Sequence, residues 1–217
     1  FALARRGQLT AAYAAVTEAL EVATELGQTT NVCDSLAHCA YLEARLGLFD
    51  RCVEHAREAV HLGLRLDLRW FAIHATGQLA LGEIGRGRPE AAVDALEPLH
   101  ARNREERLVD PGEYYFALLV EAYARSGRPD LARERLREER LLVDAVPRPF
   151  DMALLERSEG LLADEAVVEE HFERSITLHT SEMPFELART HLLYGERLRR
   201  AGARRRAREE LRRAEAL

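Results

Sequence analysis

The fold is decided by residues 81–93, which read LGEIGRGRPEAAV. Gly87 is expected to end one helix, because glycine takes the left-handed cap without steric cost. Pro89 is expected to open the next helix, where its missing N–H is not needed. The stretch therefore predicts two antiparallel helices joined by a tight turn.

The same helix-ending glycine recurs at a fixed spacing of forty residues. Gly7, Gly47 and Gly127 stand in register with Gly87, and Pro129 follows Gly127 as Pro89 follows Gly87. A fixed period in this range is the signature of a helical repeat array. We therefore expect an all-α fold.

The apolar residues between the turns recur at spacings of three and four, which is typical of amphipathic helices. We expect eleven or twelve helices in one repeat domain over residues 1–217, wound as a right-handed superhelix. The expected antiparallel helix pairs lie roughly at 1–26, 28–65, 67–106, 110–145, 149–180 and 184–217.

Several local signals refine this outline. Asp50 is placed to cap the helix that follows Gly47, and Asp110-Pro111 looks like a cap followed by proline at the first helical position. Residues 102–107 form a highly charged linker. The two prolines of residues 146–149 force extended backbone, and we interpret this break as a longer turn between repeats rather than a domain linker.

Two further columns of residues align when the turns are superimposed. The first column is mostly small and would let paired helices approach closely; it contains Ala12, Cys52, Ala92, Ala132, Val168 and Ala207. The second is mostly larger and would fill the space to the next helix; it contains Val16, Ala56, Leu96, Leu136, Phe172 and Leu211. In the fifth pair Ala163 stands in place of the glycine. The pattern resembles the tetratricopeptide repeat, but its period near forty predicts helices longer than the 34-residue family standard.

Composition excludes some functions. All 31 basic residues are Arg, so neither a Schiff-base lysine nor a Walker A phosphate loop is possible in this stretch. The net charge of −6 gives no general argument for binding nucleic acid or an acidic membrane.

Three cysteines suit a reducing cytoplasm, and no apolar run is long enough to span a membrane. The chain begins with Phe1, which indicates a fragment.

Residues 150–217 carry a more specific resemblance. The segment 184–189, PFELAR, is followed by YGERLRR at 194–200 and by an Arg- and Ala-rich helix. This arrangement resembles the end of the helical-repeat region in large ATP-binding regulators of the LuxR type, relatives of the maltose regulator MalT. In that family it lies before a C-terminal helix-turn-helix.

The resemblance implies a transcription regulator whose ATPase and DNA-binding modules lie outside these residues. It implies that the repeat region receives a small effector or a protein partner, with no cofactor of its own. Contact with DNA would pass through a module absent here, and self-association is possible. The alternative is a free-standing adaptor without a DNA-binding module.

No catalytic or metal site is predicted. No two of the eight histidines stand at the i, i+4 spacing of a helical metal site, and we expect them at the surface. No serine has the G-x-S-x-G setting of a nucleophile elbow. Cys39 and Cys52 lie on the two helices of one hairpin, where we expect Cys52 to be a packed thiol.

The remaining candidate is the concave face, which the first helix of each pair lines in repeat arrays. A mixture of Tyr, His, Arg and carboxylate side chains there would suit a peptide or a small polar effector. The expected positions are Asp34, His38, Tyr41, Arg45, His74, Gln78, Leu81, Tyr114, Leu118, Glu121 and Arg125.

The run from Arg197 to Arg213 contains nine arginines, interrupted by Glu209 and Glu210. One interpretation is electrostatic support for DNA held by a neighbouring module. We favour the other, an exposed last helix whose arginines stay hydrated.

Overall fold

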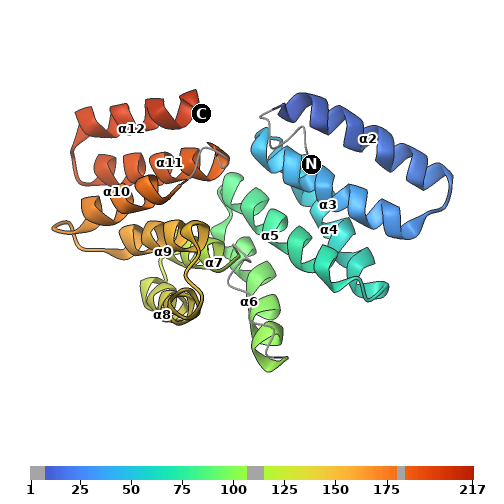
Figure 1. Ribbon diagram of the computed structural model, residues 1–217, viewed down its shortest axis with the longest axis horizontal. Coiled ribbons are helices and arrows are strands. Elements are labelled where there is room, and N and C mark those ends of the chain that lie inside the picture. Colours follow the sequence, from blue (N-terminus) through green and yellow to red (C-terminus); the bar gives the residue numbers. More distant parts are fainter. Residues whose placement is uncertain (1–7, 107–114, 180–183) are drawn as a thin grey trace. The chain divides into compact units, whose positions relative to one another are not determined.

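The computed structural model of the chain describes residues 8–106, 115–179 and 184–217. Within these ranges it contains eleven α-helices and no strand, which confirms the predicted all-α fold (Figure 1). The helices are α2 (Leu9–Glu25), α3 (Thr29–Arg45), α4 (Phe49–Arg65), α5 (Arg69–Gly85), α6 (Pro89–Glu105), α7 (Tyr115–Arg125), α8 (Pro129–Ala145), α9 (Pro149–Leu162), α10 (Val168–Leu178), α11 (Pro184–Arg200) and α12 (Arg204–Ala216).

The chain divides into two compact units, residues 1–108 and 109–217, called unit 1 and unit 2 below. In unit 1 each helix from α2 to α6 packs against the next, and the first helices α3 and α5 also contact each other. In unit 2 consecutive helices from α7 to α12 pack in the same way, and α9 contacts both α7 and α11. Each unit is thus a stack of antiparallel helix pairs.

The turns follow the predicted glycine rule. Gly47, Gly87 and Gly127 have φ angles of 73°, 71° and 73°. At the turn of Gly87, the N–H of Arg88 donates to the carbonyl of Glu83 at 2.8 Å, which is the Schellman arrangement. Helices of 17 residues joined by three-residue connections produce the forty-residue period. Gly7, the first member of the series, lies outside the described residues.

The column of small residues is largely buried. The prediction that it brings the two helices of one hairpin together is not met at Cys52, whose close contact is with α5 of the next pair. Cys52 and Ala92 are fully buried, and Ala207 is nearly so. A Cβ atom added to Gly82 would approach the Sγ of Cys52 within 3.0 Å. The second helix of one pair and the first helix of the next therefore meet at a contact that admits no larger residue, because interiors are close-packed.

The structure differs from two local predictions, at Asp50 and at the charged linker, and agrees with a third, at the proline break. α4 already begins at Phe49, so Asp50 lies in its first turn, makes no capping bond, and instead meets Arg86 Nε at 3.0 Å. The expected charged linker is largely helix, since α6 continues to Glu105. The proline break is confirmed as a turn between the packed helices α8 and α9. Asp110-Pro111 lies outside the described residues.

Candidate functional site

Six of the predicted site residues lie together on the neighbouring helices α3 and α5. Positions 34, 38, 41 and 45 repeat at helical spacing on α3, and positions 74 and 78 do so on α5, so each set faces one direction. Because α3 and α5 contact each other, the two rows meet. We call the surface formed by Asp34, His38, Tyr41, Arg45, Trp70 and His74 the α3–α5 face. Gln78 is fully buried and meets this face only through its hydrogen bond with Arg45.

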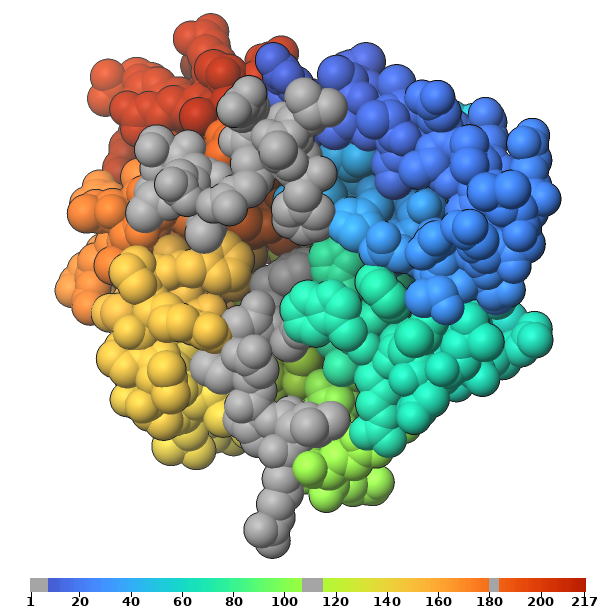
Figure 2. Space-filling view, turned by 45° about the vertical axis from the view of Figure 1, so that its right-hand side comes forward, coloured from blue at the N-terminus to red at the C-terminus, as the bar shows by residue number. Residues whose placement is uncertain are grey.

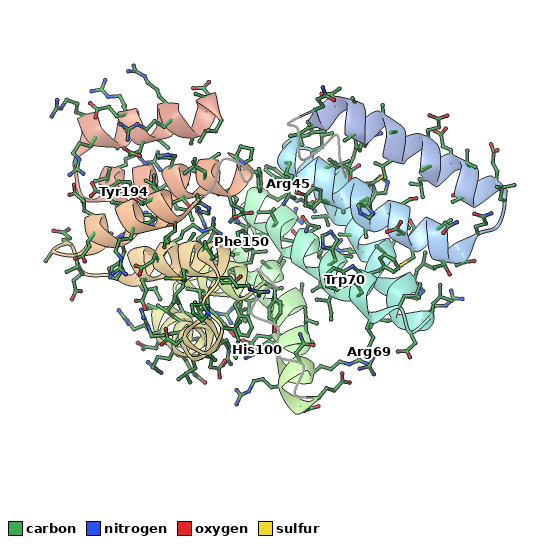
Figure 3. The ribbon with its side chains drawn as sticks, viewed as in Figure 1. Arg45, Arg69, Trp70, His100, Phe150 and Tyr194 are labelled. Atoms are coloured by element: carbon green, nitrogen blue, oxygen red, sulfur yellow. The ribbon has the colours of Figure 1, made fainter. Side chains whose placement is uncertain are left out.

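Aromatic rings form the centre of this face, of which Figure 3 labels Trp70 and Arg45. The ring of His74 stacks against Tyr41 at a centroid distance of 5.8 Å, and it lies 6.3 Å from the ring of His38. Trp70 also stacks on His74, at 6.5 Å, although 63% of Trp70 is exposed. Such offset ring pairs contribute to stability beyond the area that they bury.

Arg45 supplies the positive charge of the α3–α5 face. Its guanidinium carbon lies 3.3 Å from the centroid of the Tyr41 ring, a cation–π contact. Its Nη1 donates to the carbonyl oxygen of Tyr41 at 2.8 Å and to Oε1 of Gln78 at 3.3 Å. The guanidinium is thus held in one orientation over an aromatic ring.

His74 is neutral in this environment. Burial, together with repulsion by the nearby His38 and Arg45, lowers its pKa to about 4. Its Nε2 atom is buried and has no hydrogen-bond partner among the described residues. At the edge of the face, the half-exposed Asp34 contacts Nδ1 of His38 at 3.0 Å. The surface therefore combines a fixed cation, exposed indole and neutral imidazole.

Trp70 was missed by the sequence reasoning, although a signal was present. It lies four residues before His74, so the helical spacing that selected His74 and Gln78 also places Trp70 on the same side of α5.

The predicted positions in unit 2 do not form a matching open face. Tyr114 lies outside the described residues. Leu118 is completely buried and Glu121 is 2% exposed, so neither lines an open groove; Leu81 in unit 1 is also buried. Arg125 is partly exposed, but its Nε donates to Oε1 of Glu121 at 2.8 Å. The prediction of an accessible surface at Gln78, Leu81, Leu118 and Glu121 is corrected accordingly, because all four side chains are buried.

These α7 residues belong instead to a buried ionic network. Glu121 also accepts a bond from Arg189 of α11, and Arg125 donates to Glu196 at 2.8 Å. Burial raises the pKa of Glu121, but the attraction of Arg189, Arg125 and Arg157 outweighs it and the net pKa is lowered. Glu121 is therefore held ionised inside unit 2.

The other histidines and the cysteines include several buried side chains. His100 and His191 are buried, contrary to the expectation that the histidines lie at the surface; Nδ1 of His191 contacts Glu210 at 2.6 Å. The three cysteines are free and buried, and burial raises the pKa of Cys39 and of Cys52 to about 12. Cys52 is thus a packed thiol, as predicted. No group of three potential metal ligands occurs among the described residues.

The last helix carries its arginines largely at the surface. Arg204, Arg205 and Arg208 are exposed on α12, while Arg206 pairs with Glu169. Within the ranges that the structure describes, no helix combines the length and apolar character needed to cross a membrane.

Comparisons with known proteins support the fold. No protein-family model matches the chain, and no characterised protein matches it in sequence. Among solved structures, the chain is similar to BtubC (BKLC) from P. vanneervenii, with 19% identity and a TM-score of 0.62. The match covers 96% of this chain and 90% of that one. At this level of identity, the likeness shows a shared all-α helical-repeat fold and nothing of function.

Proposed function

We propose that the chain is an interaction domain that binds a peptide or a small polar effector on the α3–α5 face. The observation that carries the proposal is the fixed guanidinium of Arg45 over Tyr41, which is linked through the ring of His74 to the exposed ring of Trp70. A carboxylate that approaches Arg45 gains a charge-assisted hydrogen bond. A neighbouring aromatic or apolar group gains contact area on Trp70.

We further propose that this domain belongs to a LuxR-type transcription regulator, on the resemblance of residues 184–200 to that family. Because these residues lack lysine, ATP binding through a Walker A loop would belong to a module outside them. DNA binding would belong to the helix-turn-helix that the resemblance implies after them. Effector binding would stabilise one arrangement of the repeats and shift the activity of those modules.

A double substitution tests the binding proposal. We expect Tyr41→Ala with Arg45→Ala to abolish ligand binding while the helix content stays unchanged. A thermal-shift screen of sugars, nucleotides and carboxylate-bearing peptides against the unaltered chain identifies the ligand class, because a ligand that binds only the folded state raises the melting temperature. His61→Gln, an exposed change on α4, is the matched control. Unchanged binding by the double variant contradicts the siting.

The coding sequence on both sides of these residues tests the regulator proposal. A G-x-x-x-x-G-K-[ST] motif before the repeats and a helix-turn-helix after them are the expected result. The alternative is a free-standing adaptor without a DNA-binding module. Flanking sequence without either module would support the adaptor.

A further inference from the structure

Unit 1 contains a second candidate site, a pocket of about 220 Å³ between α4, α5 and α6. This part of unit 1 is coloured teal to light green in Figure 2. The pocket is lined mostly by apolar side chains, together with the buried amide of Asn103; the apolar residues are Val60, Leu64, Ala72, Ile73, Ala95, Pro98 and Leu99. Thr76 also lines it, but its hydroxyl donates to the carbonyl of Ala72 at 2.7 Å and is therefore satisfied.

Small side chains create this space. Ala72 and Thr76 on α5 face Ala95 on α6, at positions where larger residues would fill the gap between the helices. An apolar cavity of about 150 Å³ in another protein stays dry and accepts benzene. A pocket of 220 Å³ with an apolar wall is thus large enough for a short alkyl chain.

The mouth of the pocket already holds one carboxylate, which belongs to Glu106. Oε2 of Glu106 lies 2.5 Å from Nη1 of Arg69, and Oε1 lies 3.1 Å from Nε of Arg102. Arg69 comes from the start of α5 and is labelled in Figure 3, whereas Arg102 lies on α6. Two guanidinium groups from different helices therefore bracket a single carboxylate at the edge of an apolar pocket.

At this mouth, the Glu106 carboxylate can be exchanged for the carboxylate of a ligand. The side chains of Arg69, Arg102 and Glu106 are 48%, 43% and 31% exposed. Ion pairs with this exposure contribute little to stability, so little is lost when the Glu106 side chain moves away. Arg69 also pairs with the exposed Asp67 at 3.3 Å, so the mouth keeps one net positive charge once Glu106 has moved away, which favours an anionic ligand over a neutral or cationic one.

We propose that this pocket binds a medium-chain carboxylate, a compound of about eight carbons whose carboxylate replaces that of Glu106 between Arg69 and Arg102. The alkyl chain fills the space lined by Ala72, Ile73 and Ala95. This site is separate from the α3–α5 face and stands without the function proposed above, although α5 contributes residues to both.

Octanoate and octanol are the probes that separate the apolar pocket from its charged mouth. Trp70 is the only tryptophan in the chain and adjoins Arg69, so its fluorescence reports binding; calorimetry gives the affinity. We expect octanoate to bind at least tenfold more tightly than octanol. Each methylene between butyrate and octanoate should tighten binding about fourfold, as burial of about 0.8 kcal/mol per methylene requires.

Two variants test the two parts of the pocket. Ala95→Leu fills the wall and should weaken octanoate binding at least tenfold, whereas Ala91→Leu, one turn earlier on α6 and outside the pocket, should leave it unchanged. Glu106→Gln removes the competing carboxylate and should tighten octanoate binding about five- to tenfold without affecting octanol. This second variant gains affinity, so a folding defect cannot imitate the result.

Three results would overturn the proposal. The first is equal affinity for octanoate and octanol, which removes the role of the arginines. The second is an unchanged octanoate affinity in both Ala95→Leu and Glu106→Gln. The third is the absence of any fluorescence or calorimetric response to octanoate at millimolar concentration in both the unaltered chain and Glu106→Gln.

Discussion

The first helices of the two units differ in where they place arginine. On α3 of unit 1, Arg45 is partly exposed and lies over the ring of Tyr41. On α9 and α11 of unit 2, Arg157 and Arg189 are buried. Both units bury carboxylates on these helices: Glu43 and Glu83 in unit 1, and Glu121 in unit 2. The same repeat thus carries the proposed binding surface in unit 1, whereas in unit 2 it buries charges of both signs in an ionic core.

The largest effect is expected from the ionic core of unit 2. Arg157 is 2% exposed, and its Nη1 donates to Oε2 of Glu186 at 2.7 Å. Arg157→Met leaves this buried carboxylate with Arg189 at 3.7 Å as its remaining ion-pair contact on α11. Removing one partner of a buried pair costs about 3–5 kcal/mol. Urea unfolding followed by circular dichroism measures the loss.

The matched control for this prediction is Arg133→Met. Arg133 pairs with the exposed Asp130, and such a surface pair contributes about 0–1 kcal/mol. Hydrogen exchange should show the loss from Arg157→Met in α9 and α11 and not in α3 or α5. Equal stability of the two variants would mean that the buried network does not stabilise unit 2.

A second buried carboxylate in unit 2 predicts how stability depends on pH. Burial raises the pKa of Glu139 from 4.5 to about 8, against the opposing attraction of Arg157. The folded state therefore keeps a proton that the unfolded state loses, and stability falls as the pH rises from about 4.5 to 8. Glu139→Gln, which imitates the protonated form, should stabilise the chain by about 4 kcal/mol at pH 8 and add nothing at pH 4.

The measurement is the difference in unfolding free energy between Glu139→Gln and the unaltered chain across this pH range. Using the difference is necessary because His179 of unit 2 also has a lowered pKa, of about 4, caused first by burial. Glu134→Gln, an exposed change on the same helix, is the control. A difference that does not change with pH would show that Glu139 is ionised in the folded state.

Unit 1 should respond to pH in the opposite direction through His74. Its lowered pKa, about 4 against 6.5, means that the folded state binds fewer protons, so stability falls as the pH drops from 6.5 to 4. His74→Phe keeps a ring between Tyr41 and Trp70 and removes the titration. We compare the unfolding free energy of His74→Phe with that of the unaltered chain at both pH values. The difference should shift in favour of the variant by about 1–2 kcal/mol between pH 7 and pH 5.

Trp70 fluorescence during urea unfolding reports this change in unit 1, since the chain has one tryptophan. His61→Gln, on the exposed side of α4, should show no such change between the two pH values. If His74→Phe and His61→Gln behave alike, His74 is protonated in the folded state and the proposed neutral stack is wrong.

The contrast between the units also explains which parts of the structure were predictable. The positions of the turns were predictable, because a left-handed backbone conformation favours glycine and so marks Gly47, Gly87 and Gly127 in the sequence. The α3–α5 face was largely predictable because its residues follow helical spacing within two neighbouring helices. Glu121 was not, because Arg189 lies 68 residues away and no local pattern announces that pairing.

The smallest effect is expected at a turn that breaks the glycine rule. Gly27, Gly47 and Gly87 stand at spacings of twenty and forty, and Asp67 occupies the missing position with a φ of 54°. Aspartate tolerates this left-handed conformation at some cost, whereas glycine adopts it freely. Asp67 pairs with Arg69 at 3.3 Å, but its side chain is 84% exposed, so losing that pair costs little.

Asp67→Gly should therefore stabilise unit 1 by about 0.5 kcal/mol, measured by urea unfolding with Trp70 fluorescence. The reciprocal change Gly87→Asp should destabilise it by about 0.5–1 kcal/mol, because no atom lies within 4 Å of an added Cβ and only the backbone conformation matters there. If both changes shift stability in the same direction, contacts rather than the left-handed backbone determine which residue these turns accept. The forty-residue glycine series would then no longer account for where the helices end.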